Sequence, residues 1–322
     1  MDAVVLAGGY ATRLWPITKD RPKMFLPIGD ETVIDRVFAE LEADDRIDQV
    51  YVSTNARFAD DFEAHLANST FEKPTLSVED TTEEDEKLGV VGALAQLIDR
   101  ESITEDLLVI AGDNLFSFQV SDFLDFFEER EEPCLAAYDV GSIDLARQYG
   151  VLEVSGNQVT DFQEKPERPA STLVSVACYA FPADTLSAME SYLAQDNNPD
   201  EPGWFIAWLR ARQAVFAYSF DGSWFDIGTP ESYLEAVAWY LDEESHVEDG
   251  ATVTDSTIGD SVHVMSGATV TDSDIESSVI FGDAVIDACE LRGCIIDEQT
   301  EIEGIDLSGA LIGAHTQITT EN

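Results

Sequence analysis

Residues 3–29 read AVVLAGGYATRLWPITKDRPKMFLPIG, and this stretch decides how the first part of the chain folds. The apolar run at its start predicts a short buried strand that ends at Gly8-Gly9. Glycines at the end of a strand let backbone N–H groups approach a phosphate closely. Arg13 and Lys23 follow, and they supply the positive charge that a triphosphate needs. The stretch therefore predicts a phosphate-binding loop.

The whole string resembles the signature of the sugar-1-phosphate nucleotidyltransferases (nucleotide-sugar pyrophosphorylases), written GGxGTRLxPxTxxxPKxxLPI. It is not a dinucleotide-binding fingerprint, because G-x-G-x-x-G needs three glycines and no third one occurs before Gly29. Ala11 stands where the family has glycine, and since alanine resists positive φ we expect a negative-φ loop there. The resemblance implies catalytic roles for Arg13 and Lys23, and nucleotide contacts from Leu6, Ala7, Gly8, Gly9 and Thr12.

The charge balance of the 322-residue chain is extreme, with 17 Lys and Arg against 65 Asp and Glu and a net charge of −48. The acidic residues are spread along the chain, and a hydrophobic content of 44% argues against disorder. An acid-covered folded protein is typical of adaptation to molar salt, where charge repulsion is screened within about 3 Å. A DNA mimic or a cation buffer would be as acidic but would not need the phosphate-binding loop. We expect neither nucleic acid nor membranes as partners.

The four cysteines form no C-x-x-C pair and no cluster with histidine, so we predict reduced, buried thiols. The chain starts with no basic leader segment, and no apolar run approaches 18 residues. We therefore expect no signal peptide, no membrane span and a cytoplasmic location.

Strand-like and helix-like stretches alternate up to about residue 111, which predicts βαβ units and ligands at the carboxyl ends of parallel strands. After residue 128 the pattern is more mixed. We expect an α/β fold in which residues 1–244 form a nucleotidyltransferase domain with a Rossmann-like, mostly parallel sheet. The predicted strands are 3–6, 49–54, 75–78, 107–111, 134–138, 151–154, 159–163 and 174–181, and the predicted helices are 33–41, 56–66, 90–98 and 230–243.

Beyond residue 245 the pattern changes to aliphatic residues at steps of five or six. Every third one falls in a column with a spacing of 16, and Gly, Asp and Ser fill much of the space between. This predicts a parallel β-helix with three faces; a β-sandwich would match the spacing only by chance. The segment 245–322 resembles the left-handed hexapeptide-repeat β-helix that follows the catalytic domain in several nucleotidyltransferase branches. One column is Val264, Ile280, Ile296 and Ile312.

A β-helix of about four coils is only about 20 Å tall, and its ends expose open strand edges. We therefore expect it to pack on the first domain, on another subunit or on both, which makes a homo-oligomer the expected assembly. Its expected role is assembly and stability and not chemistry. An acyltransferase site is the alternative, but the segment has only three histidines, His246, His263 and His315, to build one.

Two carboxylates lie in segments typical of a metal site. Asp113 follows the predicted strand 107–111 in the string GDNLF, so it lies at the edge of a parallel sheet where ligands bind. Asp226 lies in WFDIGT, ahead of a helix start with Thr229 as N-cap. Mg²⁺ takes one or two carboxylates together with substrate phosphates and water. Both strings resemble family motifs, which implies that Asp113 and Asp226 bind Mg²⁺.

Residues 149–151 (YGV) and 163–166 (QEKP) resemble the sugar-binding motifs of the family. The resemblance implies that Glu164 meets the sugar hydroxyls and Lys165 the sugar phosphate. It also implies that Gly150 lets the backbone approach the sugar, and we place Trp224 in the same site. Without the resemblance, an exposed Glu-Lys pair would be a weak ion pair.

The base-binding region aligns with LGVVGAL at residues 88–94, which implies nucleotide contacts from Gly89 and Gly92. This segment looks like that of the mannose-type enzymes. The GDN string looks like that of the thymidylyl- and uridylyl-type members. The identity of the base is therefore left open.

The resemblance implies an enzyme of the EC 2.7.7 class. Our first choice is transfer of a nucleotidyl group from dTTP or UTP to glucose-1-phosphate, giving an NDP-sugar and pyrophosphate by Mg²⁺-assisted in-line displacement. The first alternative is a mannose-1-phosphate guanylyltransferase. An alternative of another class is a non-catalytic regulatory subunit that only binds ligands.

Overall fold

The computed structural model describes residues 1–9, 11–79 and 88–319 and divides into two compact units. The sheet unit comprises Met1–Gly8 and Arg36–Trp224, and the β-helix unit comprises Gly9–Asp35 and Phe225–Asn322. The β-helix unit therefore includes the stretch with Arg13 and Lys23, which we call the signature segment (residues 9–35).

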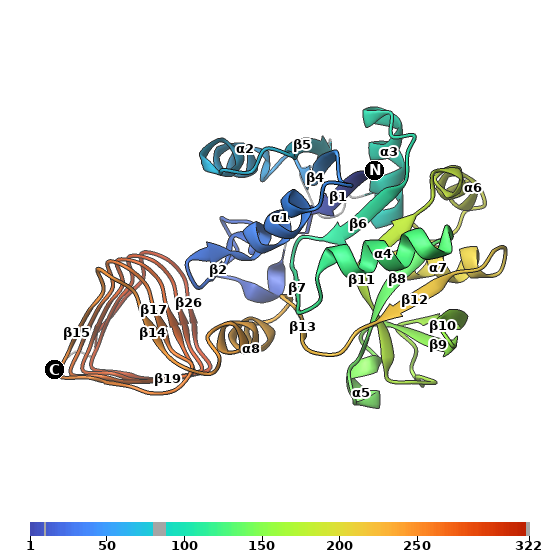
Figure 1. The fold of residues 1–322 in the computed structure, drawn as a ribbon. Helices are drawn as coiled ribbons and strands as arrows, with labels where there is room; N and C mark the ends of the chain where they lie inside the picture. The colour runs from blue at the N-terminus through green and yellow to red at the C-terminus, as the bar shows by residue number, and fades with distance from the viewer. Residues whose placement is uncertain (10, 80–87, 320–322) are drawn as a thin grey trace. The chain divides into compact units, whose positions relative to one another are not determined.

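A nine-stranded sheet forms the centre of the sheet unit (Figure 1). Its order is β5 (Pro74–Glu79), β4 (Gln49–Asn55), β1 (Asp2–Leu6), β6 (Leu107–Ala111), β11 (Leu173–Phe181), β8 (Cys134–Asp139), β12 (Phe216–Ser219), β10 (Gln158–Glu164) and β9 (Gly150–Ser155). The neighbours from β5 to β6 pair in parallel, as the βαβ pattern predicts. The later part is mixed, because β11 runs antiparallel to β6 and β8, and β10 runs antiparallel to β9 and β12.

Both faces of this sheet are covered by helices. Apolar residues of α3 (Val90–Glu101), α6 (Ser187–Leu193) and α7 (Pro202–Arg210) share one core with Leu135 of β8 and Ala217 of β12. The next residue of β12, Tyr218, points to the other face, where it packs on Phe123 and Phe126 of α4 (Val120–Arg130).

Every strand and helix predicted from the sequence is present, with ends that differ by a few residues. The predictions did not include α4, α6, α7 or β12. The remaining helices are α1 (Val33–Ala43), α2 (Ala59–Asn68), the short α5 (Ile143–Ala146) and α8 (Pro230–Tyr240). Helix α8 starts at the predicted cap, since Thr229 Oγ1 accepts a hydrogen bond from the Ser232 N–H at 3.2 Å.

In the signature segment the chain forms two short 3₁₀ turns, η1 (Thr12–Leu14) and η2 (Lys23–Phe25), and a small hairpin of β2 (Pro27–Ile28) and β3 (Glu31–Thr32). Helix α8 fixes this segment. The hydroxyl of buried Tyr233 donates to the Pro27 carbonyl at 2.7 Å.

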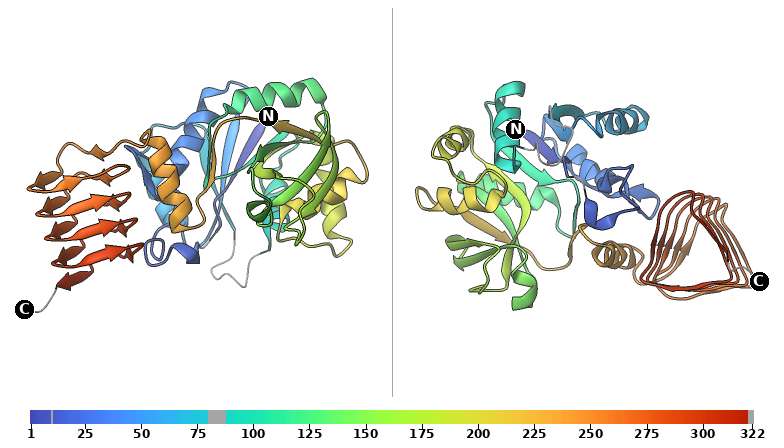
Figure 2. Two further views of the ribbon diagram at one scale, coloured as in Figure 1. Left: turned by 90° about the horizontal axis from the view of Figure 1, so that it is seen from below. Right: turned by 180° about the vertical axis from the view of Figure 1, so that it is seen from behind.

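The repeat region is a parallel β-helix whose short strands stack coil on coil into three sheets, seen end-on in Figure 1 and from the side in Figure 2. The strands pair at the predicted spacing of 16, except that the step from the first coil to the second is 17 in all three sheets, as from Val247 to Val264. Aliphatic side chains fill the interior, including the column Val264, Ile280 and Ile296. The predicted repeat and its inward columns are confirmed. The sheets are β14 (His246–Val247), β17 (His263–Val264), β20 (Val279–Ile280), β23 (Ile295–Ile296) and β26 (Leu311–Ile312); β15 (Thr252–Thr254), β18 (Thr269–Thr271), β21 (Val285–Asp287), β24 (Glu301–Glu303) and β27 (Gln317–Thr319); and β16 (Thr257–Ile258), β19 (Asp274–Glu276), β22 (Glu290–Arg292) and β25 (Asp306–Ser308).

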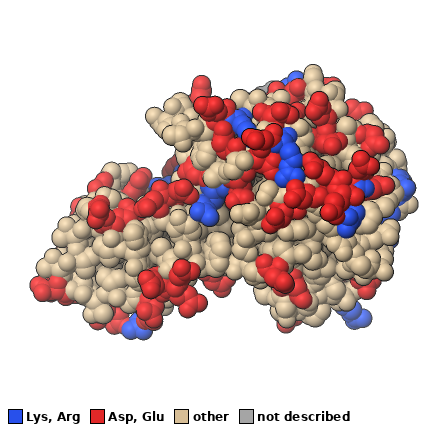
Figure 3. All heavy atoms as spheres, in the orientation of Figure 1, with Lys and Arg blue, Asp and Glu red and all other residues tan. Residues whose placement is uncertain are grey.

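The surface carries far more Asp and Glu than Lys and Arg, as Figure 3 shows for one face. The four cysteines are buried free thiols, as predicted. Within the described part of the chain, no helix is both long enough and apolar enough to cross a membrane.

Candidate active site

The carboxyl end of β1, where the phosphate-binding loop begins, is held by polar side chains of β4. Thr54 Oγ1 donates to the Ala7 carbonyl at 3.2 Å, and Asn55 Nδ2 donates to the Gly8 carbonyl at 3.0 Å. At the end of β5, Glu79 accepts a hydrogen bond from Ser53 Oγ at 3.0 Å, and burial raises the pKa of this carboxyl group. These residues were not among the predicted site residues. A sequence signal for them exists, because three polar residues, Ser53 to Asn55, end a buried strand.

Asp113 lies two residues after the end of β6 and begins a chain of contacts toward the sugar-binding motifs. The amide Nδ2 of Asn114 in β7 (Asn114–Phe116) donates to Asp113 Oδ1 at 2.9 Å. The amide oxygen of Asn114 in turn accepts a hydrogen bond from Trp224 Nε1 at 2.6 Å. The Trp224 ring packs edge-on against Tyr149, with ring centroids 4.9 Å apart. The predicted site residue Trp224 is thereby joined to both the GDN and the YGV strings.

Glu164 and Lys165, at the end of β10, lie beside this chain of contacts. The Lys165 N–H donates to the Tyr149 carbonyl at 3.1 Å, so the EKP and YGV strings are hydrogen-bonded neighbours. Glycines make room for Glu164, because a Cβ at Gly203 would lie 1.6 Å from Glu164 Oε2 and one at Gly150 would lie 3.0 Å from it. The side chain of Lys165 pairs with Glu201 at the start of α7. The structure thus brings Gly150, Glu164 and Lys165 together, and their contacts with a sugar phosphate stay predictions.

Burial, together with the nearby charge of Glu201, raises the pKa of Glu164 to about 7 from its ordinary 4.5. If the carboxylate accepts hydrogen bonds from substrate hydroxyls, kcat/KM for the sugar phosphate should rise as the pH increases through about 7. The effect on folding has the opposite sign. A raised pKa stabilises the fold fully below the unfolded pKa, and this contribution is lost as the pH rises through 7.

A pH profile of kcat/KM for wild type and Glu164→Gln checks this expectation. The substrate phosphate also titrates near pH 6, but it does so equally for both proteins. The variant should therefore lose the inflection near pH 7 and keep the one from the substrate. Identical profiles for the two proteins would contradict the role of Glu164.

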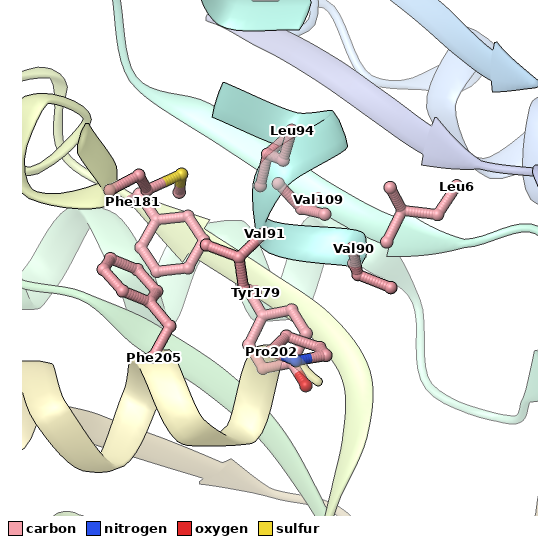
Figure 4. Close-up of a pocket in the computed structure, with 10 residues that line it drawn as sticks. Leu6, Val90, Val91, Leu94, Val109, Tyr179, Phe181, Pro202 and Phe205 are labelled. Carbon is pink, nitrogen blue, oxygen red and sulfur yellow. The ribbon is translucent and has the colours of Figure 1, made fainter. Parts of the chain in front are cut away.

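Gly89 and Gly92, the predicted base-binding glycines, lie at the start of α3. Gly89 has a φ of 75°, and a Cβ there would lie 2.5 Å from the carbonyl of Pro199. That carbonyl accepts the Val91 N–H at 2.9 Å, so packing against the chain at Pro199 already explains Gly89. The neighbouring cavity has a volume of only about 10 Å³ and is lined by apolar side chains such as Val90 (Figure 4). The nucleotide contacts of Gly89 and Gly92 remain predictions.

In the β-helix unit, the signature segment presents Arg13 and Lys23. Arg13 is exposed in η1, and no hydrogen bond or ion pair joins it to another residue that the structure describes. The Lys23 side chain runs past Gly9, since a Cβ built on Gly9 would lie 4.0 Å from Lys23 Cε. Thr12 is exposed beside Arg13.

The expected negative φ at Ala11 is wrong, because its φ is 48° and its ψ is 42°. Left-handed backbone costs alanine about 1–2 kcal/mol. Two hydrogen bonds to the Ala11 carbonyl hold the conformation, one from Thr18 Oγ1 at 2.8 Å and one from the Leu14 N–H at 3.1 Å. The loop thus keeps the geometry that glycine would favour.

Asp113 and Asp226 are both half-buried carboxylates, a donor set that suits Mg²⁺. Asp226 belongs to the β-helix unit, where Gly228 packs against its carboxylate. Among the described residues, no group of three His, Cys, Asp or Glu side chains is arranged to hold a metal ion. The binding of Mg²⁺ by Asp113 and Asp226 stays a prediction.

Comparison with known proteins gives the family. The sequence profile described as Nucleotidyl transferase matches residues 2–243. The chain belongs to the nucleotidyl transferase family. The profile described as GlmU-like, C-terminal hexapeptide matches residues 240–318. The resemblance drawn from the signature, GDN, EKP and WFDIGT strings is confirmed at the level of the family.

The relatives carry different substrate names. A protein of Sulfolobus acidocaldarius named "Putative mannose-1-phosphate guanyltransferase" is 28% identical over 235 residues, which are 73% of this chain and 61% of the relative. The "UTP--glucose-1-phosphate uridylyltransferase AglF" of Haloferax volcanii is 30% identical over 243 residues, which are 73% of this chain and 95% of the relative. The chain spans between 53% and 61% of the length of four of the curated relatives that it matches.

A solved structure has the same fold. It is titled as a "Putative Glucose-1-Phosphate Thymidylyltransferase" from Bacillus anthracis in complex with a sucrose. The TM-score is 0.65 at 24% sequence identity, and the match covers 78% of this chain and 97% of the other. The α/β fold expected from the alternating strands and helices is thereby confirmed.

Proposed function

We propose that this nucleotidyl transferase family member transfers a nucleotidyl group from a nucleoside triphosphate to a sugar-1-phosphate and releases pyrophosphate. The observation that supports the proposal is the chain of contacts from Asp113 through Asn114 and Trp224 to Tyr149. The backbone carbonyl of Tyr149 also accepts a hydrogen bond from the Lys165 N–H, which connects the EKP string to this chain of contacts. It joins Asp113, a carboxylate suited to a phosphate-bound metal, with the half-buried carboxyl group of Glu164 and with Lys165, which are suited to a phosphorylated sugar.

In the proposed reaction an oxygen of the sugar phosphate attacks the α-phosphorus of the nucleotide in line and displaces pyrophosphate. Lys165 binds the sugar phosphate, and Glu164 accepts hydrogen bonds from the sugar hydroxyls. Arg13 binds the triphosphate and the leaving pyrophosphate, while Lys23 stabilises charge at the α-phosphate. Leu6, Ala7, Gly8, Gly9 and Thr12 would contact the nucleotide. Such catalysis consists of positioning and charge neutralisation, with no covalent enzyme intermediate.

Asp113 and Asp226 would hold Mg²⁺, which supplies charge neutralisation at phosphate oxygens when it is bound. Glucose-1-phosphate with dTTP or UTP is the first choice of substrates, supported by the GDN string and by the name of the Haloferax volcanii relative. Mannose-1-phosphate with GTP is the alternative, supported by the LGVVGAL segment and by the name of the Sulfolobus acidocaldarius relative. A homo-oligomer working in the cytoplasm completes the proposal.

A screen for pyrophosphate release tests the proposal. Five nucleoside triphosphates are paired with glucose-, mannose- and N-acetylglucosamine-1-phosphate in molar KCl with Mg²⁺. One pair should be turned over at least about tenfold faster than the others, because unpaired polar groups in a site reject the wrong substrate. Nucleotide binding without turnover of any pair would favour the non-catalytic regulatory subunit.

A further inference from the structure

Arg21 lies in the signature segment two residues before Lys23, and the β-helix binds its side chain. The guanidinium Nη2 lies 3.0 Å from Oδ1 of Asp297 and 3.2 Å from Oε1 of Glu298. The same guanidinium lies over the ring of Phe281, 5.3 Å from its centroid, at a distance suited to a cation–π interaction. Three residues from two coils therefore hold one arginine of the signature segment.

The carboxylate of Asp297 is removed from water, because its side chain is only 3% exposed. A buried carboxylate is costly unless it is paired and hydrogen-bonded. Besides Arg21, Asp297 Oδ1 accepts the Glu298 N–H at 2.8 Å. Molar salt screens such a pair much less than it screens a surface pair. The position of Arg21 is therefore tied to the β-helix under the conditions where this acidic protein is expected to work.

A second contact holds the same segment beside Arg13. A Cβ at Gly313, in the turn after β26, would lie 2.9 Å from Cβ of Pro16. Because that distance is shorter than real Cβ contacts, glycine at this position lets the coil approach the segment closely. The β-helix thus contacts the signature segment at two places. One is Pro16, three residues after Arg13, and the other is Arg21, two residues before Lys23.

We propose that Arg21 is a positioning residue for nucleotidyl transfer, and that the β-helix, through Asp297, fixes the segment that carries Lys23. The inference rests on the proposed function, since it assigns the coils a part in the reaction beyond the assembly and stability expected from their sequence. Displacing a catalytic group by about 1 Å can cost about 10²-fold in rate. The Arg21–Asp297 pair is therefore placed to control kcat without touching substrate.

Steady-state kinetics of Arg21→Ala, Arg21→Lys and Asp297→Asn, at temperatures well below their melting points, test the proposal. Arg21→Ala and Asp297→Asn should each lower kcat about tenfold or more, with a smaller change in KM for the sugar phosphate. Asp297→Asn leaves no buried charge unpaired, so it should fold. Arg21→Lys keeps the charge and should recover part of the lost kcat. The double variant Arg21→Ala/Asp297→Asn should be no slower than the worse single variant, because both changes remove one interaction.

Two β-helix variants serve as controls. Ile296→Val lowers stability next to Asp297 without contacting the segment, and Arg292→Ala removes an arginine paired only with exposed Glu276 and Glu290 among the described residues. Both should keep the wild-type kcat. If Arg21→Ala lowers the melting temperature as Ile296→Val does but keeps kcat within twofold of wild type, the pair is purely structural and the proposal falls. A wild type that turns over no substrate pair would instead overturn the proposed function.

Discussion

Asp113→Asn and Asp226→Asn should each lower kcat by about 10²-fold or more while leaving the melting temperature within a few degrees of wild type. The expected loss is that of one preorganised electrostatic group in a phosphoryl-transfer site. The fold should survive because both side chains are half-buried and asparagine has nearly the same shape. Pyrophosphate release at saturating Mg²⁺, with thermal melts of the same samples, measures both quantities.

The matched control is Asp184→Asn, which neutralises an exposed carboxylate in a 3₁₀ turn of the sheet unit. It should keep the wild-type rate. Near-normal rates in both the Asp113 and the Asp226 variants would show that these carboxylates take no part in the mechanism. If only one variant needs a higher Mg²⁺ concentration, only that residue would remain a predicted Mg²⁺ ligand.

Lowering the salt concentration should unfold the protein, because 65 acidic residues face only 17 basic ones. Repulsion among surface carboxylates acts over about 10 Å at 0.1 M salt and over about 3 Å at 1 M. Few cations are available to offset it. Lys73, for example, donates to three backbone carbonyls at and just after the end of α1, and to no carboxylate in the part of the chain that the structure describes. Between 0.1 and 2 M KCl the melting temperature should rise by about 10 °C or more, a shift that corresponds to a few kcal/mol at this size.

A variant that removes three neighbouring exposed charges, Asp242→Asn/Glu243→Gln/Glu244→Gln, separates charge repulsion from other effects of salt. It should melt at a higher temperature than wild type in 0.1 M KCl and at nearly the same temperature in 2 M KCl. A melting temperature that does not change with KCl in the wild type would reject the adaptation to molar salt.

Periodicity made much of the fold predictable. The aliphatic column through Val264 and Ile280 fixes the β-helix register, because each inward residue must stack on the one 16 positions earlier. The alternating strands and helices before residue 111 likewise predict the parallel half of the sheet. Helix α4 was missed, although Phe123 and Phe127 lie on its buried face, because charged residues interrupt its apolar pattern. The strands of the second half were predicted, but their antiparallel direction could not be foreseen, since strand direction depends on pairing partners that are distant in sequence.

Site residues were predictable where a local string carries them, as with Glu164 and Lys165. Their environment was not, because it comes from residues distant in sequence. Gly203 makes room for Glu164, and Trp224 reaches Asn114 across 110 positions. The left-handed backbone conformation of Ala11 could not be predicted from its local string either. Its conformation depends on the hydroxyl of Thr18, whose hydrogen bond no propensity scale includes.

The bond between Arg21 and Asp297 also has a consequence for protein synthesis, because 276 positions separate the two residues. A ribosome completes the nine-stranded sheet long before it reaches the coil that carries Asp297. Until then the nascent chain holds its signature segment without this anchor, and closing so long a loop is entropically expensive. A chain released early by premature termination would thus carry Arg13 and Lys23 on a loosely held loop. Under the proposed function and the proposed role of Arg21, dependence on the last coils would keep such unfinished chains from consuming nucleotide.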